Sequence, residues 1–273
     1  MECKKQESQG EQPDQLKDEQ TALELETRAK WESLRPSFNA WAEQSGEPLS
    51  EFDHIVDRQV EYARVTYQKQ RARAELAKYS VPWDRVTIEE AASLEELLKT
   101  NADERALHRF LDANPKFLIQ VLGGGHGRYQ LSKQRLGAEF VPDFLIAETS
   151  SIGIEWHAVE IGSPRAIAHR QDGLPAETLN HALGQIHDWR RWLMNNLDYA
   201  RRPREQDGLG LVGIDSRVPG LVLIGRRQAF PDRFNEFRKQ VADRERIVIH
   251  SYDWLIDVAR SNRSGRLGGE LPE

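Results

Sequence analysis

The hydrophobic pattern changes character near residue 100. Before that point, apolar residues recur three or four positions apart, which predicts helices from about residue 19 to residue 79. Pro36 must bend or break the first of these helices. The later segment has a thin apolar stripe, made of Phe52, Ile55, Tyr62 and Val65. A stripe that narrow packs more often against another helix than against a sheet. Two structures fit this stripe: a helical hairpin used for self-association, and a long solvated helix lying on its own domain.

Beyond residue 100, strand-like runs alternate with helices. A short amphipathic helix is expected over residues 101–114, with Asn101 as its N-cap. Apolar runs that predict strands follow at residues 116–123, 127–134, 139–147 and 152–161. A long helix over about residues 174–197 precedes a strand, a helix, a second strand and a closing helix. This order predicts a mixed α/β domain whose central sheet is flanked by helices.

These patterns divide the chain of 273 residues into four expected parts. They are a disordered tail (1–18), a helical regulatory or assembly region (19–95), an α/β domain (96–262) and a flexible tail (263–273). No apolar run approaches the roughly 20 residues that span a bilayer, and the N-terminus lacks the apolar core of a secretory signal. Cys3 is the only cysteine, which excludes a disulfide scaffold and a thiolate zinc site and favours a cytoplasmic setting. The net charge of −6 argues against a broad basic surface but leaves room for a local basic groove.

Two acids stand in apolar, strand-like settings. Asp143 lies in FVPDFLIA and Glu160 lies in HAVEIG. Consecutive strands are usually neighbours in space, so the two carboxyl groups are expected to meet at one end of the sheet. Two carboxylates in a partly dry site repel each other, and oxygen ligands suit Mg²⁺ or Mn²⁺. Asp143 as a turn cap and Glu160 as the partner of an arginine remain open as structural alternatives.

A series of motifs gives these acids a family context. VPDF, a strand ending in VEI and an amphipathic helix resemble the PD-(D/E)xK nuclease core. The longer series FLDANPKFL, RLGAEFVPDFLI, WHAVEIGSP, LNHALGQIHDWRRWLMNN, LVLIGR and YDWL resembles the nuclease domain of the Shedu antiphage defence proteins, over about residues 101–260. The resemblance implies a restriction-endonuclease-like fold and a Mg²⁺-dependent nuclease acting on DNA. It also implies a homo-oligomer with a variable, regulatory N-terminal region.

The resemblance assigns roles to several residues. Asp143, Glu160 and the backbone carbonyl of Ile161 match the metal ligands of the family. Glu104 matches an acidic position of the first core helix, although its spacing from Asn101 also fits a capping box. Gln185 matches the glutamine that such nucleases direct at the site from the long helix; as a plain reading it is a surface residue.

Gly162 is the departure from the motif, because the family pattern has lysine two residues after the glutamate. Arg165, just past Pro164, is the expected substitute, since its side chain could fold back over the glycine. Lys133 and Arg135 on an earlier strand are the rival sources of the cation. A silent domain with a solvated Arg165 is the further alternative.

Loose arginine pairs are usually solvated surface, but the loop after Tyr199 is the best candidate for phosphate contacts. The expected nucleic-acid contacts are Lys133, Arg135, Arg201, Arg202 and Arg204. The sequence therefore predicts a cytoplasmic antiphage nuclease that cuts DNA with a divalent metal. A nuclease-fold domain that binds nucleic acid without cutting it, or an assembly protein with a vestigial site, are the alternatives.

Overall fold

The computed structural model describes residues 13–100, 102–123 and 126–261. The chain divides into two compact units. The helical unit comprises Met1–Glu75 with Arg202–Gly210, and the sheet unit comprises Leu76–Arg201 with Leu211–Glu273.

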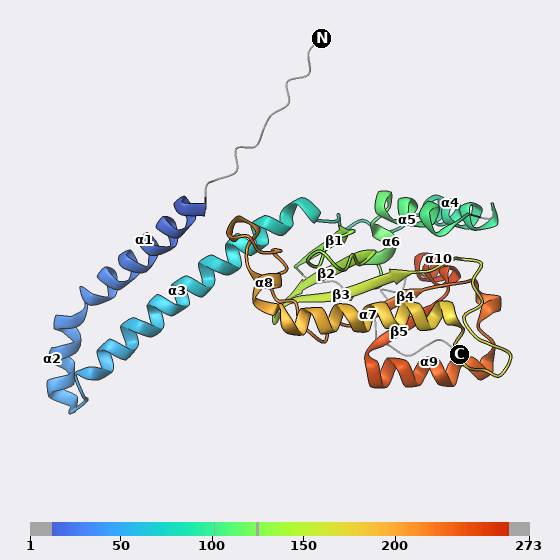
Figure 1. Cartoon of the computed structure of the whole chain (residues 1–273). Helices are drawn as coiled ribbons and strands as arrows, with labels where there is room; N and C mark the ends of the chain where they lie inside the picture. Colours follow the sequence, from blue (N-terminus) through green and yellow to red (C-terminus); the bar gives the residue numbers. More distant parts are fainter. Residues whose placement is uncertain (1–12, 101, 124–125, 262–273) are drawn as a thin grey trace, which may run out of the picture. The chain divides into compact units, whose positions relative to one another are not determined.

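The helical unit is built on an antiparallel hairpin. Its helices are α1 (Pro13–Glu32), α2 (Arg35–Ser45) and α3 (Ser50–Leu76) (Figure 1). Pro36 lies in the first turn of α2, so it breaks the helical run where the sequence predicted. Arg28 pairs with Asp57 at 2.7 Å, and the Tyr67 hydroxyl donates to Glu19 at 2.7 Å. Since later residues of α1 meet earlier residues of α3, the two helices run in opposite directions.

The predicted apolar stripe of α3 is correct in part. Phe52 is buried, with its ring 5.0 Å from that of Phe38, and Val56 is buried one turn later. Tyr62, in contrast, is 71% exposed. Ten residues after Phe52, the helix has made about 2.8 turns, so Tyr62 lies roughly 80° around the helix from Phe52, at the side of the hairpin interior. The prediction of a single stripe that included Tyr62 was therefore wrong.

The expected domain limits differ from the observed ones at two places. Residues 13–18 belong to α1 rather than to a disordered tail, while residues 1–12 and the expected flexible tail at 263–273 lie outside the described residues. Helix α4 (Ile88–Lys99), which begins at a capping box of Thr87 and Glu90, belongs to the sheet unit. Its Leu94 packs in the core of that unit. The compact sheet unit thus begins before residue 96.

A five-stranded mixed sheet forms the centre of the sheet unit. Its strands, in spatial order, are β1 (Gly127–Ser132), β2 (Phe144–Ser150), β3 (Gly153–Ile161), β4 (Gly220–Leu223) and β5 (Ile247–His250). The first three strands are antiparallel, and the last three are parallel. Helices α7 (Glu177–Asn195) and α9 (Asp232–Glu245) make the two crossovers between parallel strands.

Helices cover both faces of this sheet, as the sequence predicted (Figure 1). One face packs against α4, α5 (Glu104–Ala113), α6 (Lys116–Ile119) and α10 (Tyr252–Ser261), and the other against α7 and α9. Short elements complete the chain: η1 (Ala77–Tyr79), α8 (Leu197–Arg201), η2 (Arg204–Gln206) and η3 (Arg227–Ala229). No helix of the described residues is both long enough and apolar enough to cross a bilayer.

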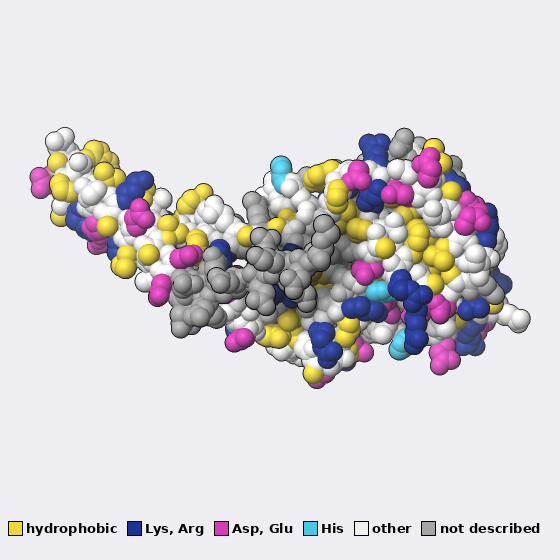
Figure 2. Space-filling view, turned by 90° about the horizontal axis from the view of Figure 1, so that it is seen from above, with side chains coloured by type: hydrophobic (Ala, Val, Ile, Leu, Met, Phe, Trp, Pro, Cys, Tyr) yellow, Lys and Arg dark blue, Asp and Glu magenta, His cyan; other side chains and the backbone are white. Residues whose placement is uncertain are grey.

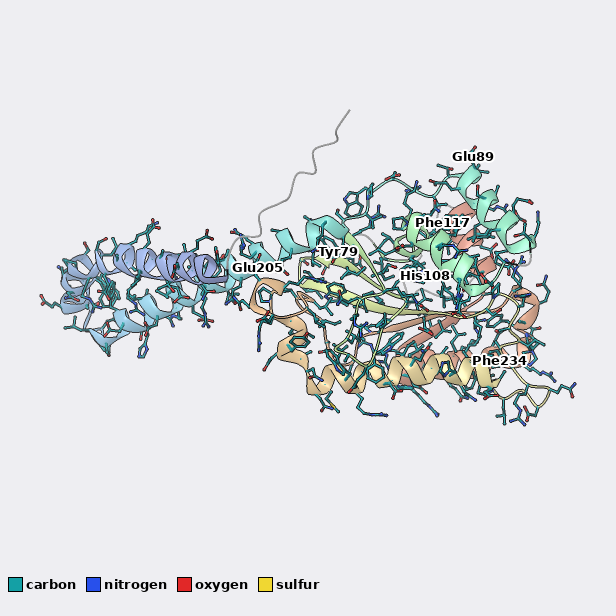
Figure 3. The ribbon with its side chains drawn as sticks, turned by 45° about the horizontal axis from the view of Figure 1, so that its top comes forward. Tyr79, Glu89, His108, Phe117, Glu205 and Phe234 are labelled. Carbon is teal, nitrogen blue, oxygen red and sulfur yellow. The ribbon has the colours of Figure 1, made fainter. Side chains whose placement is uncertain are left out.

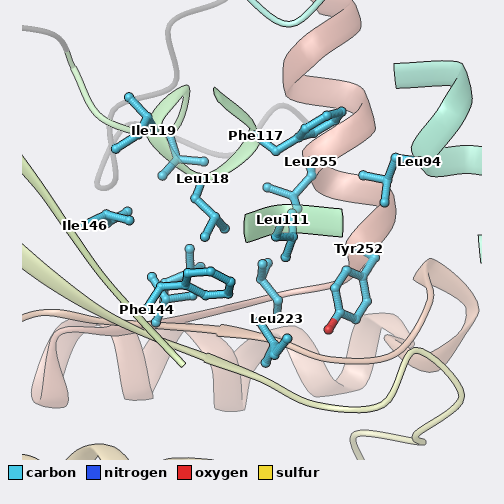
Figure 4. Close-up of a cluster of buried hydrophobic side chains, with 14 of the residues drawn as sticks. Leu94, Leu111, Phe117, Leu118, Ile119, Phe144, Ile146, Leu223, Tyr252 and Leu255 are labelled. Atoms are coloured by element: carbon cyan, nitrogen blue, oxygen red, sulfur yellow. The ribbon is translucent and has the colours of Figure 1, made fainter. Parts of the chain in front are cut away.

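The core of the first face explains the direction of Glu160. Val159 and Ile161 of β3 lie in one buried cluster with Phe144, Leu223 and Tyr252 (Figure 4). Because side chains alternate along a strand, Glu160 points away from this cluster, towards the α7 side of the sheet.

Two local predictions were wrong. The run expected as a strand at residues 116–123 begins with helix α6, with Pro115 as its N-cap residue. Three apolar residues in a row fit a buried helix turn as well as a strand, so periodicity could not separate the two. Helix α5 begins at Glu104 and is capped by the Asp103 side chain, which accepts from the Ala106 N–H at 2.8 Å. The expected cap, Asn101, lies outside the described residues.

Candidate active site

Asp143 and Glu160 meet where β2 and β3 adjoin. The antiparallel register pairs Phe144 with Val159, which brings the preceding Asp143 level with Glu160. The Asp143 Oδ2 atom accepts a hydrogen bond of 2.9 Å from the Ile161 N–H. The carboxyl groups of Asp143 and Glu160 share a further hydrogen bond. The structure therefore brings together the two acids and the peptide of Ile161 that the sequence singled out.

Glu160 is the strongly perturbed member of this acid pair. Burial, followed by the negative charge of Asp143, raises the pKa of Glu160 to about 9. Glu160 is therefore protonated near neutral pH in the metal-free protein, which allows two carboxyl groups to share one site. A perturbed acid beside a second acid is typical of functional sites.

Glu104 belongs to the electrostatic surroundings of this pair. Burial and then the charge of Asp143 raise its pKa, and its own charge contributes to the raised pKa of Glu160. Glu104 is not the capping-box residue, because Asp103 caps α5. Even so, no group of three or more His, Cys, Asp or Glu side chains in the described residues could hold a metal ion. Asp143 and Glu160 are the two acids that the register of β2 and β3 places level with each other.

This pair fits Mg²⁺ or Mn²⁺ on the chemistry of its donors. Mg²⁺ is commonly held by one or two carboxylates together with water and substrate phosphates. A divalent cation would also relieve the repulsion that keeps a proton on Glu160. The carbonyl of Ile161, whose N–H already contacts Asp143, is the backbone group available beside the acids.

Lys133 is the cation that the structure places on the acids. Its ammonium forms an ion pair with Asp143 Oδ1, and its backbone N–H donates to the Asp143 carbonyl oxygen at 2.9 Å. β1 ends at Ser132, and Lys133 has a φ of 49° in the turn that follows. The sequence predicted that Lys133 and Arg135 share one face of a strand, and this prediction was wrong because both residues follow the end of β1. The guanidinium of Arg135 instead donates to the nearby Ala138 carbonyl at 3.3 Å.

Arg165 does not lie over Gly162 as expected. In the described part of the chain, no hydrogen bond or ion pair joins its exposed guanidinium to Asp143 or Glu160. Arg165 lines a cavity of about 580 Å³ together with Leu98, Pro164 and Ile167. A side chain at position 162 would meet Ile224, whose atoms lie 3.1 Å from the place a Cβ would take. The expectation of a hole above Gly162 was wrong because Ile224 closes that space.

Two residues near the acids were missed at the sequence level. The Tyr252 hydroxyl donates to the Gly162 carbonyl at 2.8 Å, and burial raises its pKa well above the usual value. His108 of α5 is labelled in Figure 3. Its ring stacks on that of Phe144 at 4.5 Å, and its Nε2 lies 3.4 Å from the Asp143 carbonyl oxygen. The i, i+4 spacing of Glu104 and His108 was the available signal for His108.

Gln185 lies on α7, the helix that packs against β3 and β4. Its Oε1 atom is buried without a hydrogen-bond partner. In the described residues no hydrogen bond connects it to either acid, and its role at the site stays a prediction. A buried amide oxygen without a partner is costly, which sets Gln185 apart from a plain surface residue.

The arginines after Tyr199 fall into different settings. Arg201 of α8 donates to the Ile214 carbonyl at 2.7 Å. Arg202 and Arg204 belong to the helical unit, where the Arg204 N–H donates to Glu75 at 3.0 Å. The three arginines are thus divided between the two units, and their contacts with nucleic acid stay a prediction. On the face shown in Figure 2, basic and acidic side chains of the sheet unit are interspersed.

The comparison with known families agrees with the motif series. The family described as "Shedu protein SduA, C-terminal" matches residues 101–256, which is more than half of the chain. None of the curated proteins compared with the chain matches it. The matched region contains the five strands, the acid pair and Lys133. The chain therefore belongs to the family of Shedu proteins, with its sheet unit carrying the SduA C-terminal region.

Proposed function

We propose that the sheet unit is a divalent-metal-dependent nuclease that hydrolyses phosphodiester bonds in DNA. Membership in the Shedu family implies a role in antiphage defence. The observation that carries the proposal is the meeting of Asp143 and Glu160 at the end of two neighbouring strands, with Lys133 paired to Asp143. Metal-assisted phosphoryl transfer requires acids, a cation and a backbone carbonyl close together, and these groups meet here at one end of β2 and β3.

Asp143 and Glu160 would hold Mg²⁺ or Mn²⁺, which supplies activation of water and stabilisation of the charge on the phosphate. In the reaction a water oxygen bonds to phosphorus, one ester P–O bond breaks and the leaving oxygen takes up a proton. The Ile161 N–H fixes the orientation of the Asp143 carboxylate. His108, stacked on Phe144, supports the backbone at Asp143 from the α5 side.

Plasmid nicking tests this function. Supercoiled plasmid is incubated with Mg²⁺ or Mn²⁺ and with the wild type, Asp143→Asn or Glu139→Gln. Glu139 is the matched control, because it is an exposed acid four residues before Asp143. We expect metal-dependent nicking by the wild type and the control but not by Asp143→Asn. Absence of nicking by the wild type with either metal, under conditions in which it binds DNA, would favour the alternative of a nucleic-acid-binding domain that does not cut.

A further inference from the structure

Position 162 leaves little room for a side chain in this protein. The Gly162 N–H donates to the Leu223 carbonyl at 2.8 Å, and its carbonyl accepts from Tyr252 at 2.8 Å. Its backbone is therefore bound on both sides. A Cβ there would lie 3.1 Å from two atoms of Ile224, a contact tighter than ordinary packing. A cation for the site must come from another part of the chain.

Lys133 is tied to Asp143 at two points, through its ammonium and through its backbone N–H. It also adopts a positive φ of 49°, a conformation that costs free energy for any residue with a Cβ. Glycine or asparagine would satisfy the turn more easily, so the backbone conformation alone does not call for lysine. The side chain is what distinguishes lysine here, and its charge lowers the pKa of both Glu104 and Glu160.

The two partners differ in access to solvent. The Asp143 side chain is 9% exposed, whereas the Lys133 side chain is 52% exposed. Lysine is a flexible side chain with three donors, so its ammonium can leave one oxygen ligand for another nearby. The carboxylate is fixed by the Ile161 N–H, so the lysine is the mobile partner.

We propose that Lys133 occupies the acid site as a cation in the absence of metal and moves to the substrate phosphate when the metal binds. Its ammonium neutralises Asp143 in the metal-free protein. Once a divalent cation takes over that charge, the ammonium donates to a non-bridging oxygen of the scissile phosphate and stabilises the negative charge developing there. Lys133 acts here as a hydrogen-bond donor and not as the base. This inference rests on the proposed nuclease function for its second step but not for its first.

Two measurements on the full chain test the two steps separately. The first is thermal unfolding of the metal-free protein and its shift upon titration with MgCl₂. The second is the nicking rate on plasmid. Both are made for the wild type, Lys133→Met, Lys133→Arg and Lys239→Met. Lys239 is the matched control, because it is an exposed lysine on α9.

For Lys133→Met we expect the two readouts to change in opposite directions. The Mg²⁺ concentration that gives half of the maximal shift in melting temperature should fall about fivefold. This is the effect expected from removing a partly exposed ion pair that competes with the metal. Nicking falls about 10²-fold, the usual effect of removing one donor to the transition state. Lys133→Arg restores part of the nicking rate, and Lys239→Met behaves as the wild type in both measurements.

Other outcomes overturn the proposal in identifiable ways. If Lys133→Met nicks plasmid at the wild-type rate, the proposed contact between Lys133 and the scissile phosphate is refuted. A weaker Mg²⁺ response together with lost nicking shows that Lys133 only supports the shape of the site. If the wild type does not nick, the nuclease function fails, while a tighter Mg²⁺ response of Lys133→Met would still support the exchange of lysine for metal.

Discussion

The carboxyl group of Glu160 shares a hydrogen bond with that of Asp143, at the point where β2 and β3 adjoin. Such a bond requires one proton between two acids, and burial places that proton on Glu160. Without a proton or a cation between them, the two carboxylates would repel each other and destabilise the fold.

The pH dependence of stability should report the proton on Glu160. Because its pKa rises from 4.5 to about 9 on folding, the folded state holds a proton that the unfolded chain releases between these values. The free energy of unfolding of the metal-free protein should therefore fall as pH rises from 5 to 9. Glu160→Gln cannot titrate, so its curve should be flatter. Denaturant unfolding at a series of pH values measures this.

The control for that prediction is Glu155→Gln, since Glu155 is an exposed glutamate of the same strand. Its curve should have the slope of the wild type. An equal slope for Glu160→Gln and the wild type would contradict the raised pKa.

Substitutions of Asp143 should separate charge from structure. Asp143→Ala removes the acceptor of the Ile161 N–H as well as the partner of Lys133, so its melting temperature should fall. Asp143→Asn retains an acceptor oxygen and should melt closer to the wild type. Neither variant should nick plasmid or protect cells from phage. Wild-type nicking by either variant would refute the assignment of Asp143 to the metal.

The prediction of the acid pair succeeded because its signals are local. A charge inside an apolar run marks each acid, and the order of consecutive strands places the two together. The source of the cation could not be predicted in this way. The source of the cation depends on the positive φ of Lys133 and on the packing of Ile224 against Gly162. Neither feature produces a periodic pattern in the sequence. Arg165 was the predicted source because it is close to Gly162 in sequence. Closeness in sequence does not give the distance in space between residues separated by a turn.

The same distinction holds for the fold. The crossover helices and buried strands have long, clear patterns, and both the mixed sheet and its flanking helices were predicted. The helix at Lys116–Ile119 was missed because its three apolar residues are too few to show a period. The phase of Tyr62 on α3 was misjudged because a thin stripe leaves few positions to fix the helix face.

Arg165 should contribute to binding of DNA rather than to the chemical step. Its exposed guanidinium lines the cavity that follows β3 in the chain, and the described residues show no contact between it and the acids. Arg165→Ala should weaken DNA binding and reduce the salt dependence of log Kd by about one counterion, with little change of the nicking rate at saturating DNA. Fluorescence anisotropy at several salt concentrations and single-turnover nicking measure the two effects. A loss of about 10²-fold in nicking at saturation would return the catalytic role to Arg165.

The helical unit should mediate assembly of the chain into a homo-oligomer. The described part of this unit leaves Leu34, Trp41 and Leu49 half exposed, at 48%, 52% and 52%, around α2, although large apolar side chains gain free energy from burial. We expect Trp41→Ser combined with Leu49→Ser to lower the number of subunits measured by light scattering, since these side chains are available to a second copy. The matched control is Ile88→Ser, which removes a side chain that is 74% exposed in the sheet unit. The double variant should retain the circular dichroism spectrum of the wild type, because neither side chain is buried in the hairpin. An unchanged subunit number for the double variant, together with a reduced one for Ile88→Ser, would move the assembly surface to the sheet unit.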